Sequence, residues 1–198
     1  EKSKAPTSFE VHVMGQIESA VFPNDDNLFC QFQLLHGSDW QVAAGMEDGI
    51  TQISMVSMGS ERKVIWNFPI DITFKSTNVY GWPQLILEVH GTDIFNRDVI
   101  RGYGSVHLPL TPGSHVLHVR MFRPLSSSLF QQFIGWLGGE PPEYIDSKRP
   151  GMATGREVTR VASTGVVTVK LNAVMRNMKQ LGYTTPAPQP SAVANPVW

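Results

Sequence analysis

The feature that most constrains the fold is the alternating stretch from Trp66 to Tyr103. In its first part, large apolar residues occupy every second position and mostly polar residues lie between them. These apolar residues are Phe68, Ile70, Ile72 and Phe74. A period of two places them on one face of an extended chain, so we predict a half-buried strand here. Residues 84–90 repeat the pattern with Leu85, Leu87 and Val89 inward, and residues 101–104 lead into a third antiparallel strand.

The rest of the chain continues this pattern of short apolar runs separated by Gly, Pro, Asn and Asp. The further predicted strands are Phe9–Ala20, Leu28–His36, Ile50–Val56, Tyr103–Leu110, Ser114–Met121, Arg156–Ala162 and Val166–Met175. The predicted connections include a loop over residues 43–49, a hairpin turn at 163–165 and a short helical turn at 176–181. About eight strands at this spacing predict an all-β fold, an antiparallel β-sandwich. A closed barrel is the alternative that the same signals allow.

One helix is predicted, inserted late in the chain over residues 126–137. Serines precede it as possible caps, and Gly138 and Gly139 end it. The segment has no charged residue and carries aromatic and aliphatic side chains at three- and four-residue spacing. It could cover an open end of the sandwich or contact a partner or membrane. The residues that we assign to partner contact are Phe130, Phe133, Trp136 and Leu137.

Length and composition indicate one domain with two short tails. We predict a flexible leader over residues 1–8, a domain over 9–183 and a flexible Pro- and Ala-rich tail over 184–198. The chain has 16 basic and 17 acidic residues, which gives no basic footprint for nucleic acid. The single cysteine, Cys30, cannot form an internal disulfide, and this favours a reducing compartment such as the cytoplasm.

No arrangement of residues in the sequence predicts catalysis or a cofactor. The acidic residues considered for calcium are Asp25, Asp26, Asp39, Glu47, Asp48, Asp93 and Asp98. They are scattered, whereas calcium needs several converging oxygens. His115 and His118 are three apart in a predicted strand, so they lie on opposite faces and cannot share a zinc ion. No serine has a nucleophile-elbow pattern, and Cys30 is predicted to be a core residue. We therefore expect no metal, no cofactor and no enzymatic activity.

A small basic pair remains as a possible contact site. Arg156 and Arg160 are an even number of residues apart, so they share a face of the predicted strand. Such a face could contact anionic lipid headgroups. Because Glu157 lies between them and no wider basic excess surrounds them, a solvated surface is the favoured interpretation of the pair.

Several of these stretches together resemble the B9-domain family. The matching segments are Trp66–Asp71, Phe74–Asn78, Tyr80–Gln84, Arg101–Gly104, Gly15–Ala20, Arg156–Val161 and Leu181–Tyr183. The resemblance covers about residues 10 to 184. It implies a C2-like β-sandwich and a non-enzymatic scaffold in the Meckel-syndrome protein complex. That complex lies at the base of the cilium, in the basal body and transition zone.

The resemblance also implies partners. These are other B9-domain proteins and transition-zone membrane proteins, joined through protein contacts needed for ciliogenesis and for gating of ciliary membrane proteins. It implies a cytoplasmic, cytoskeleton-associated location. Weak phospholipid contact is a further expectation, and a peripheral C2 module that binds phospholipid, with or without calcium, is the competing hypothesis. Family membership does not identify which residues contact partners.

Overall fold

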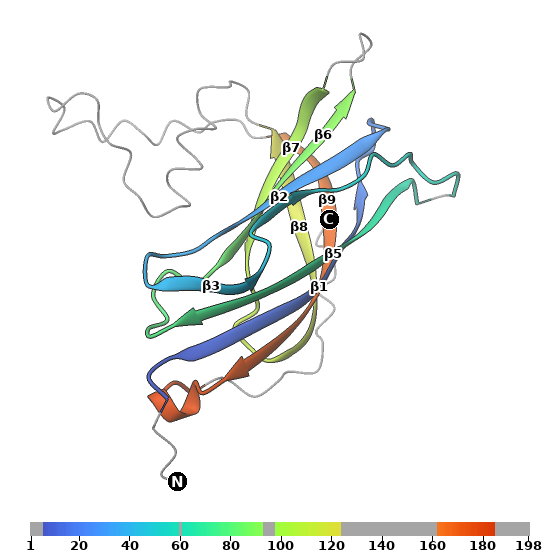
Figure 1. Ribbon diagram of the computed structural model, residues 1–198. Helices are drawn as coiled ribbons and strands as arrows, with labels where there is room; N and C mark the ends of the chain where they lie inside the picture. The colour runs from blue at the N-terminus through green and yellow to red at the C-terminus, as the bar shows by residue number, and fades with distance from the viewer. Residues whose placement is uncertain (1–5, 60, 93–97, 124–161, 185–198) are drawn as a thin grey trace, which may run out of the picture.

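The computed structural model describes residues 6–59, 61–92, 98–123 and 162–184. Within these residues, nine strands form one curled antiparallel sheet (Figure 1). The strands are β1 (Phe9–Val21), β2 (Leu28–Leu35), β3 (Trp40–Gly45), β4 (Asp48–Ile50), β5 (Lys63–Ser76), β6 (Gln84–Thr92), β7 (Asp98–His107), β8 (Gly113–Arg123) and β9 (Ala162–Arg176). A short 3-10 helix, η1 (Lys179–Leu181), confirms the helical turn predicted near the end of the domain.

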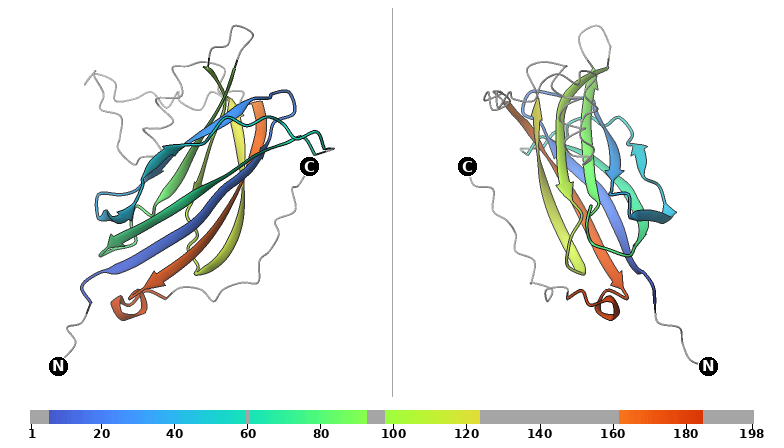
Figure 2. Two further views of the ribbon diagram at one scale, coloured as in Figure 1. Left: turned by 45° about the vertical axis from the view of Figure 1, so that its right-hand side comes forward. Right: turned by 90° about the vertical axis from the view of Figure 1, so that its left-hand side faces the viewer.

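The sheet divides into two layers because β7 and β8 barely pair. The strand order is β3-β5-β1-β9-β8-β7-β6-β2-β4, and the β7–β8 ladder consists of the single pair Tyr103–Phe122. Strands β3, β5, β1, β9 and β8 therefore form one layer, and β7, β6, β2 and β4 form the other (Figures 1 and 2). The two strands at the ends of this order, β3 and β4, do not pair with each other. The sheet is therefore an open sandwich, and the barrel alternative is wrong.

The core lies between the layers and consists of the residues that the alternation places inward. On β5, Trp66, Ile70, Ile72 and Phe74 are buried while the residues between them face solvent or are half-buried. The inward set predicted on β6, Leu85, Leu87 and Val89, is confirmed. On β9 the same alternation buries Val167, Val169, Leu171 and Ala173. The predicted core position of Cys30 is also confirmed, and Trp40 and Trp66 are buried as well, since at most 3% of each is exposed.

The predictions for residues 43–56 are wrong. The expected loop over 43–49 contains the end of β3 and the start of β4. The expected strand over Ile50–Val56 is reduced to the end of β4 followed by two isolated bridges, Leu28–Ser54 and Val56–Val64. The chain here passes from β3, which pairs with β5 in one layer, to β4, which pairs with β2 in the other layer. No single ladder can therefore include all of residues 43–56.

The hairpin turn predicted at residues 163–165 is also wrong. Strand β9 runs without interruption through these residues, and Gly165 pairs with Met121 of β8. A Cβ atom on Gly165 would lie 2.5 Å from the carbonyl oxygen of Val21 and 2.8 Å from the ring of Phe22. The glycine therefore permits close packing inside the sandwich and marks no turn.

Two of the predicted elements fall outside the described residues. They are the helix over residues 126–137 and most of the strand over Arg156–Ala162. They remain predictions. Within the part of the chain that the structure describes, no helix has the length and apolar character that a membrane crossing requires.

Candidate interaction surface

Two of the acids considered for calcium, Asp25 and Asp26, are engaged with neighbouring protein groups. The Oδ1 atom of Asp26 accepts the backbone N–H groups of Asn27 and Val56, both at 2.7 Å. These two hydrogen bonds lower the pKa of Asp26. Asp25 lies 3.2 Å from the Arg101 guanidinium. The acids of this loop therefore serve to join the β1–β2 loop to its neighbours.

The other candidate metal and nucleophile residues are also dispersed. His36 contacts Glu47 at 3.3 Å, and the side-chain amide of Asn78 donates to Asp39. Among the described residues, no three His, Cys, Asp or Glu side chains are grouped so that they could hold a metal ion. Cys30 is fully buried, and this burial raises the pKa of its thiol. The thiolate is the nucleophilic form, so Cys30 is unsuited to nucleophilic chemistry in the folded chain.

The most unusual described surface is the segment that follows β4, where the usual polarity is inverted. Ile50, Ile53 and Met55 are 57%, 60% and 69% exposed, whereas Thr51 is only 5% exposed. A segment shaped by the core alone would bury the apolar side chains and expose the threonine. Exposed apolar side chains that are grouped together indicate a contact site.

Hydrogen bonds to β2 hold this inverted arrangement in place. The hydroxyl of Thr51 accepts the N–H of Cys30 at 2.9 Å and donates to the carbonyl of Gln52 at 3.0 Å. The N–H of Thr51 donates to the carbonyl of Cys30 at 2.9 Å. Further along, Leu28 and Ser54 exchange two backbone hydrogen bonds. Thr51 therefore faces β2, and the apolar neighbours are left outside.

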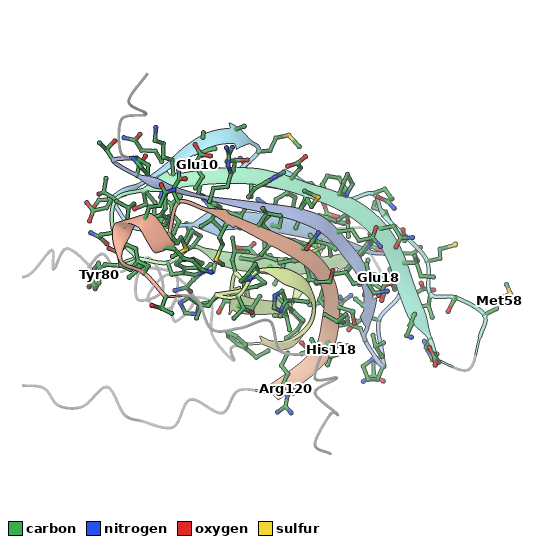
Figure 3. The ribbon with its side chains drawn as sticks, turned by 90° about the horizontal axis from the view of Figure 1, so that it is seen from below. Glu10, Glu18, Met58, Tyr80, His118 and Arg120 are labelled. Atoms are coloured by element: carbon green, nitrogen blue, oxygen red, sulfur yellow. The ribbon has the colours of Figure 1, made fainter. Side chains whose placement is uncertain are left out.

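The exposed apolar group extends onto β5. An isolated antiparallel bridge joins Val56 of this segment to Val64 of β5, and Ile65 follows Val64 directly in the chain. Ile65 is 50% exposed, and Met58 is fully exposed at the tip of the connection, where it projects from one end of the molecule (Figure 3). We call this surface the β4–β5 patch. It consists of Ile50, Ile53, Met55, Met58 and Ile65.

The β4–β5 patch has no charge within its main segment. Residues 50–58 contain no Asp, Glu, Lys or Arg. Asp48 lies two residues before this segment, and Glu61 and Lys63, which pair with each other, follow it. The Asp26 carboxylate also accepts the N–H of Val56 within it. An uncharged surface with several isoleucine and methionine side chains suits an apolar protein partner, since methionine adapts its shape to different contacts.

The opposite end of the sandwich is built around an aromatic cluster. Trp40 lies at its centre, with ring centroids 5.0 Å from Trp82, 5.5 Å from Phe9 and 6.1 Å from Phe74. The indole N–H of Trp82 donates to the carbonyl of Leu108 at 3.0 Å. The Tyr80–Gln84 segment is thus a rigid loop that closes this end of the core. Trp82 is only partly buried, but it packs against the core.

The outer face of the β1–β9–β8 layer carries charges of both signs. Lys170 contacts Glu18 at 2.5 Å, and Arg176 contacts Glu10 at 3.6 Å. Arg120 projects from β8 toward solvent (Figure 3). Because acids are interspersed among these cations, the described face offers no uniform basic surface to anionic lipid.

None of the partner-contact residues predicted from the sequence falls within the described residues. These are Phe130, Phe133, Trp136, Leu137, Arg156 and Arg160. The residues of the β4–β5 patch were not predicted, because a short segment with several apolar residues, such as Ile50–Val56, is typical of a strand that buries them. The available signal was the unusual period of this run, with Thr51 and Ser54 between apolar residues that do not alternate regularly.

Comparisons with known proteins identify the family. The family model B9-C2, described as "Ciliary basal body-associated, B9 protein", matches residues 11–174. The chain is 50% identical to B9 domain-containing protein 1 of Xenopus laevis, over 92% of each chain. It is 32% identical to B9 domain-containing protein 2 of Bos taurus, over 87% of this chain and 97% of the relative.

A solved structure is also similar. It is a C2 domain of plant Extended Synaptotagmin 1, at 13% identity and a TM-score of 0.39, covering 86% of this chain and 96% of that domain. The family assignment depends on the family model and on the relatives, not on this structure. The chain, whose described strands form an antiparallel β-sandwich, therefore belongs to the B9-C2 family of ciliary basal body-associated B9 proteins.

Proposed function

We propose that this chain is a non-enzymatic scaffold subunit of a B9 complex at the ciliary transition zone. It would associate with other B9-domain proteins and connect them to transition-zone membrane proteins. In this way it would support ciliogenesis and the gating of ciliary membrane proteins, from a cytoplasmic, cytoskeleton-associated position. The relatives named B9 domain-containing proteins 1 and 2 support a role among B9 proteins at the ciliary base.

The observation that supports a scaffold is the β4–β5 patch. Its apolar side chains are at least half exposed, and buried hydrogen bonds at Thr51 hold them outward. Hiding this area from water on a partner would be favourable, at about 25 cal/mol for each Å² of apolar surface buried. We therefore assign the contact with another B9 domain to this patch, with the segment over residues 126–137 and the pair Arg156 and Arg160 as further proposed contacts.

Co-purification tests this function directly. The chain is co-expressed with mouse B9 domain-containing protein 2, and the mixture is separated by size-exclusion chromatography. We expect the two proteins to elute as one complex, and we expect the double variant Ile53→Ser with Met55→Ser to elute separately. Val116→Ser is the control, because Val116 is also 50% exposed but lies on β8, outside the patch. Separate elution of the two wild-type proteins at micromolar concentration would contradict the proposal.

Phospholipid binding is the competing function, and it is tested by sedimentation with liposomes. Because charges of both signs share the described outer face, we expect weak binding to phosphatidylserine vesicles that calcium does not strengthen. Tight calcium-dependent binding would favour a membrane module over a protein scaffold.

A further inference from the structure

The outward face of β6 and β7 is buried, although it lies outside the core. On β6, Leu85 and Leu87 face the core, so Ile86 between them faces outward. Tyr103 of β7 pairs with Glu88, two residues after Ile86, and therefore lies on the same outward face. Ile86 is nonetheless only 3% exposed, and Tyr103 only 6%. Neither side chain belongs to the buried cluster that fills the space between the two layers.

The polar side chains of this face are also shielded from water. Glu88 and His90 follow Ile86 at alternate positions of β6, and their side chains are only 25% and 15% exposed. The Nε2 atom of His90 lies 3.5 Å from the Glu88 carboxylate, but it is buried and makes no hydrogen bond. Charged and polar side chains on an open sheet face normally reach water. We call Ile86, Glu88, His90 and Tyr103 the β6–β7 outer face.

The outer face of the other layer shows how exposed such positions are when nothing covers them. Val116 of β8 is 50% exposed, Val174 of β9 is 42% exposed, and Met14 of β1 is 37% exposed. Strands β9 and β1 have a neighbouring strand on each side, as β6 does. Neighbouring strands alone therefore leave an outward apolar side chain more than a third exposed. The burial of Ile86 requires further atoms that lie over the sheet.

The segment that follows β8 has the position and composition to supply these atoms. Phe122, near the end of β8, pairs with Tyr103, so the chain leaves β8 beside the β6–β7 outer face. Residues 124–139 contain no charged side chain, whereas residues 140–161 contain both acids and bases. The helix predicted over residues 126–137 would be about 18 Å long. Strand β6 lies two strands from β8, a distance of about 10 Å, which the segment can span.

We propose that the uncharged segment over residues 126–137 packs on the β6–β7 outer face of its own chain and covers Ile86 and Tyr103. A helix that lies on a sheet buries one side, so its other apolar side chains stay available to a partner. The inference goes beyond the proposed function, because it concerns packing within one chain. Its test uses this chain alone. Failure here therefore leaves the complex with B9 domain-containing protein 2 to be judged by co-purification.

The rate at which an introduced cysteine reacts with a maleimide measures whether the face is covered. Ile86→Cys is studied in the otherwise unchanged full chain and in a four-serine chain. The four changes are Phe130→Ser, Phe133→Ser, Trp136→Ser and Leu137→Ser. Val116→Cys is the matched control, because Val116 lies on the open outer face of the other layer. The native Cys30 is buried and reports folding, since it reacts rapidly only in a chain that unfolds.

The proposal predicts that Ile86→Cys reacts at least about tenfold more slowly than Val116→Cys in the otherwise unchanged chain, at every protein concentration. The four-serine chain loses most of this difference while Cys30 stays slow. Equal rates for the two cysteines in the otherwise unchanged chain would overturn the proposal. Protection that rises with protein concentration would also overturn it, because a second copy would then cover the face.

The C-terminal residues 185–198 are also uncharged, so they are tested as an alternative cover. Ile86→Cys should stay slow in a chain that ends at Thr184. Rapid reaction in that chain, with Cys30 still slow, would overturn the proposal in favour of the C-terminal residues.

Cross-linking keeps the test decisive if the four-serine chain does not fold. Ser105 is half-buried and pairs with Ile86 at the edge of the covered face. Ser105→Cys with Phe133→Cys, in the otherwise unchanged chain, should form an intrachain cross-link with a short bismaleimide. Val116→Cys with Phe133→Cys is the control and should cross-link much less. Equal yields from the two pairs would overturn the proposal.

Discussion

Replacing Thr51 by valine tests how the β4–β5 patch is held outward. Valine has nearly the same shape but cannot accept the N–H of Cys30, which the Thr51 hydroxyl accepts at 2.9 Å in a buried position. The carbonyl of Cys30 keeps its partner, because it accepts the backbone N–H of residue 51. The substitution therefore leaves one buried donor without an acceptor.

The expected cost follows mainly from that buried donor, because the Gln52 carbonyl, which also loses the Thr51 hydroxyl, is only partly buried. A buried donor left unsatisfied costs about 1–3 kcal/mol of the free energy of unfolding. For a domain of this size, each kcal/mol corresponds to about 2–4 °C in Tm. Thr51→Val should therefore lower the urea midpoint and the Tm, and it should speed hydrogen exchange at the Cys30 amide.

Thr51→Ser is the matched control, because it keeps the oxygen and loses only a methyl group. It should leave exchange at the Cys30 amide slow even if it costs some packing energy. If Thr51→Val unfolds at the wild-type urea midpoint and its Cys30 amide remains protected, then the hydroxyl does not hold the segment and the explanation of the patch is wrong.

Three further results are expected. Gly15→Ala should lower the free energy of unfolding by at least about 2 kcal/mol in urea, since its Cβ would lie 2.0 Å from the Lys170 carbonyl oxygen. Gly59→Ala is the control and should be near neutral, because no atom lies within 4 Å of the added Cβ. Because the pKa of Asp26 is lowered, its ionised form stabilises the fold. The stability advantage over Asp26→Asn should be complete above the ordinary value of 3.8 and vanish as pH falls through the lowered pKa; an advantage independent of pH would contradict this. Cys30 should react with a thiol reagent only as fast as the chain unfolds, and rapid labelling of the native protein would show that it is not buried.

Most of the sandwich is predictable from the sequence because its strands are buried on one face only. The alternation in β5, from Trp66 to Phe74, marks both the strand and its inward side. The same holds for β6 and β9. A half-buried strand repeats its environment every two residues, so a local pattern is sufficient to identify it.

The errors arise where distant parts of the chain decide the outcome. Gly165 is typical of a turn in the sequence, but here the close approach of Val21 and Phe22 requires a residue without a side chain. Residues 50–56 alternate irregularly between apolar and polar side chains, and sequence alone cannot show that Thr51 takes the inward place through its bond to Cys30. The candidate site was missed for this reason, because surfaces that bind partners break the rule that assigns apolar residues to the core.

The most direct test of the assigned contact surface is hydrogen–deuterium exchange of the chain alone and in complex with mouse B9 domain-containing protein 2. We predict slower exchange on binding at residues 50–58 and 63–66, which carry the β4–β5 patch, and little change on the outer face of β8 and β9. A stable complex in which exchange slows on that outer face while residues 50–58 remain unchanged would contradict the claim that the patch is the contact surface.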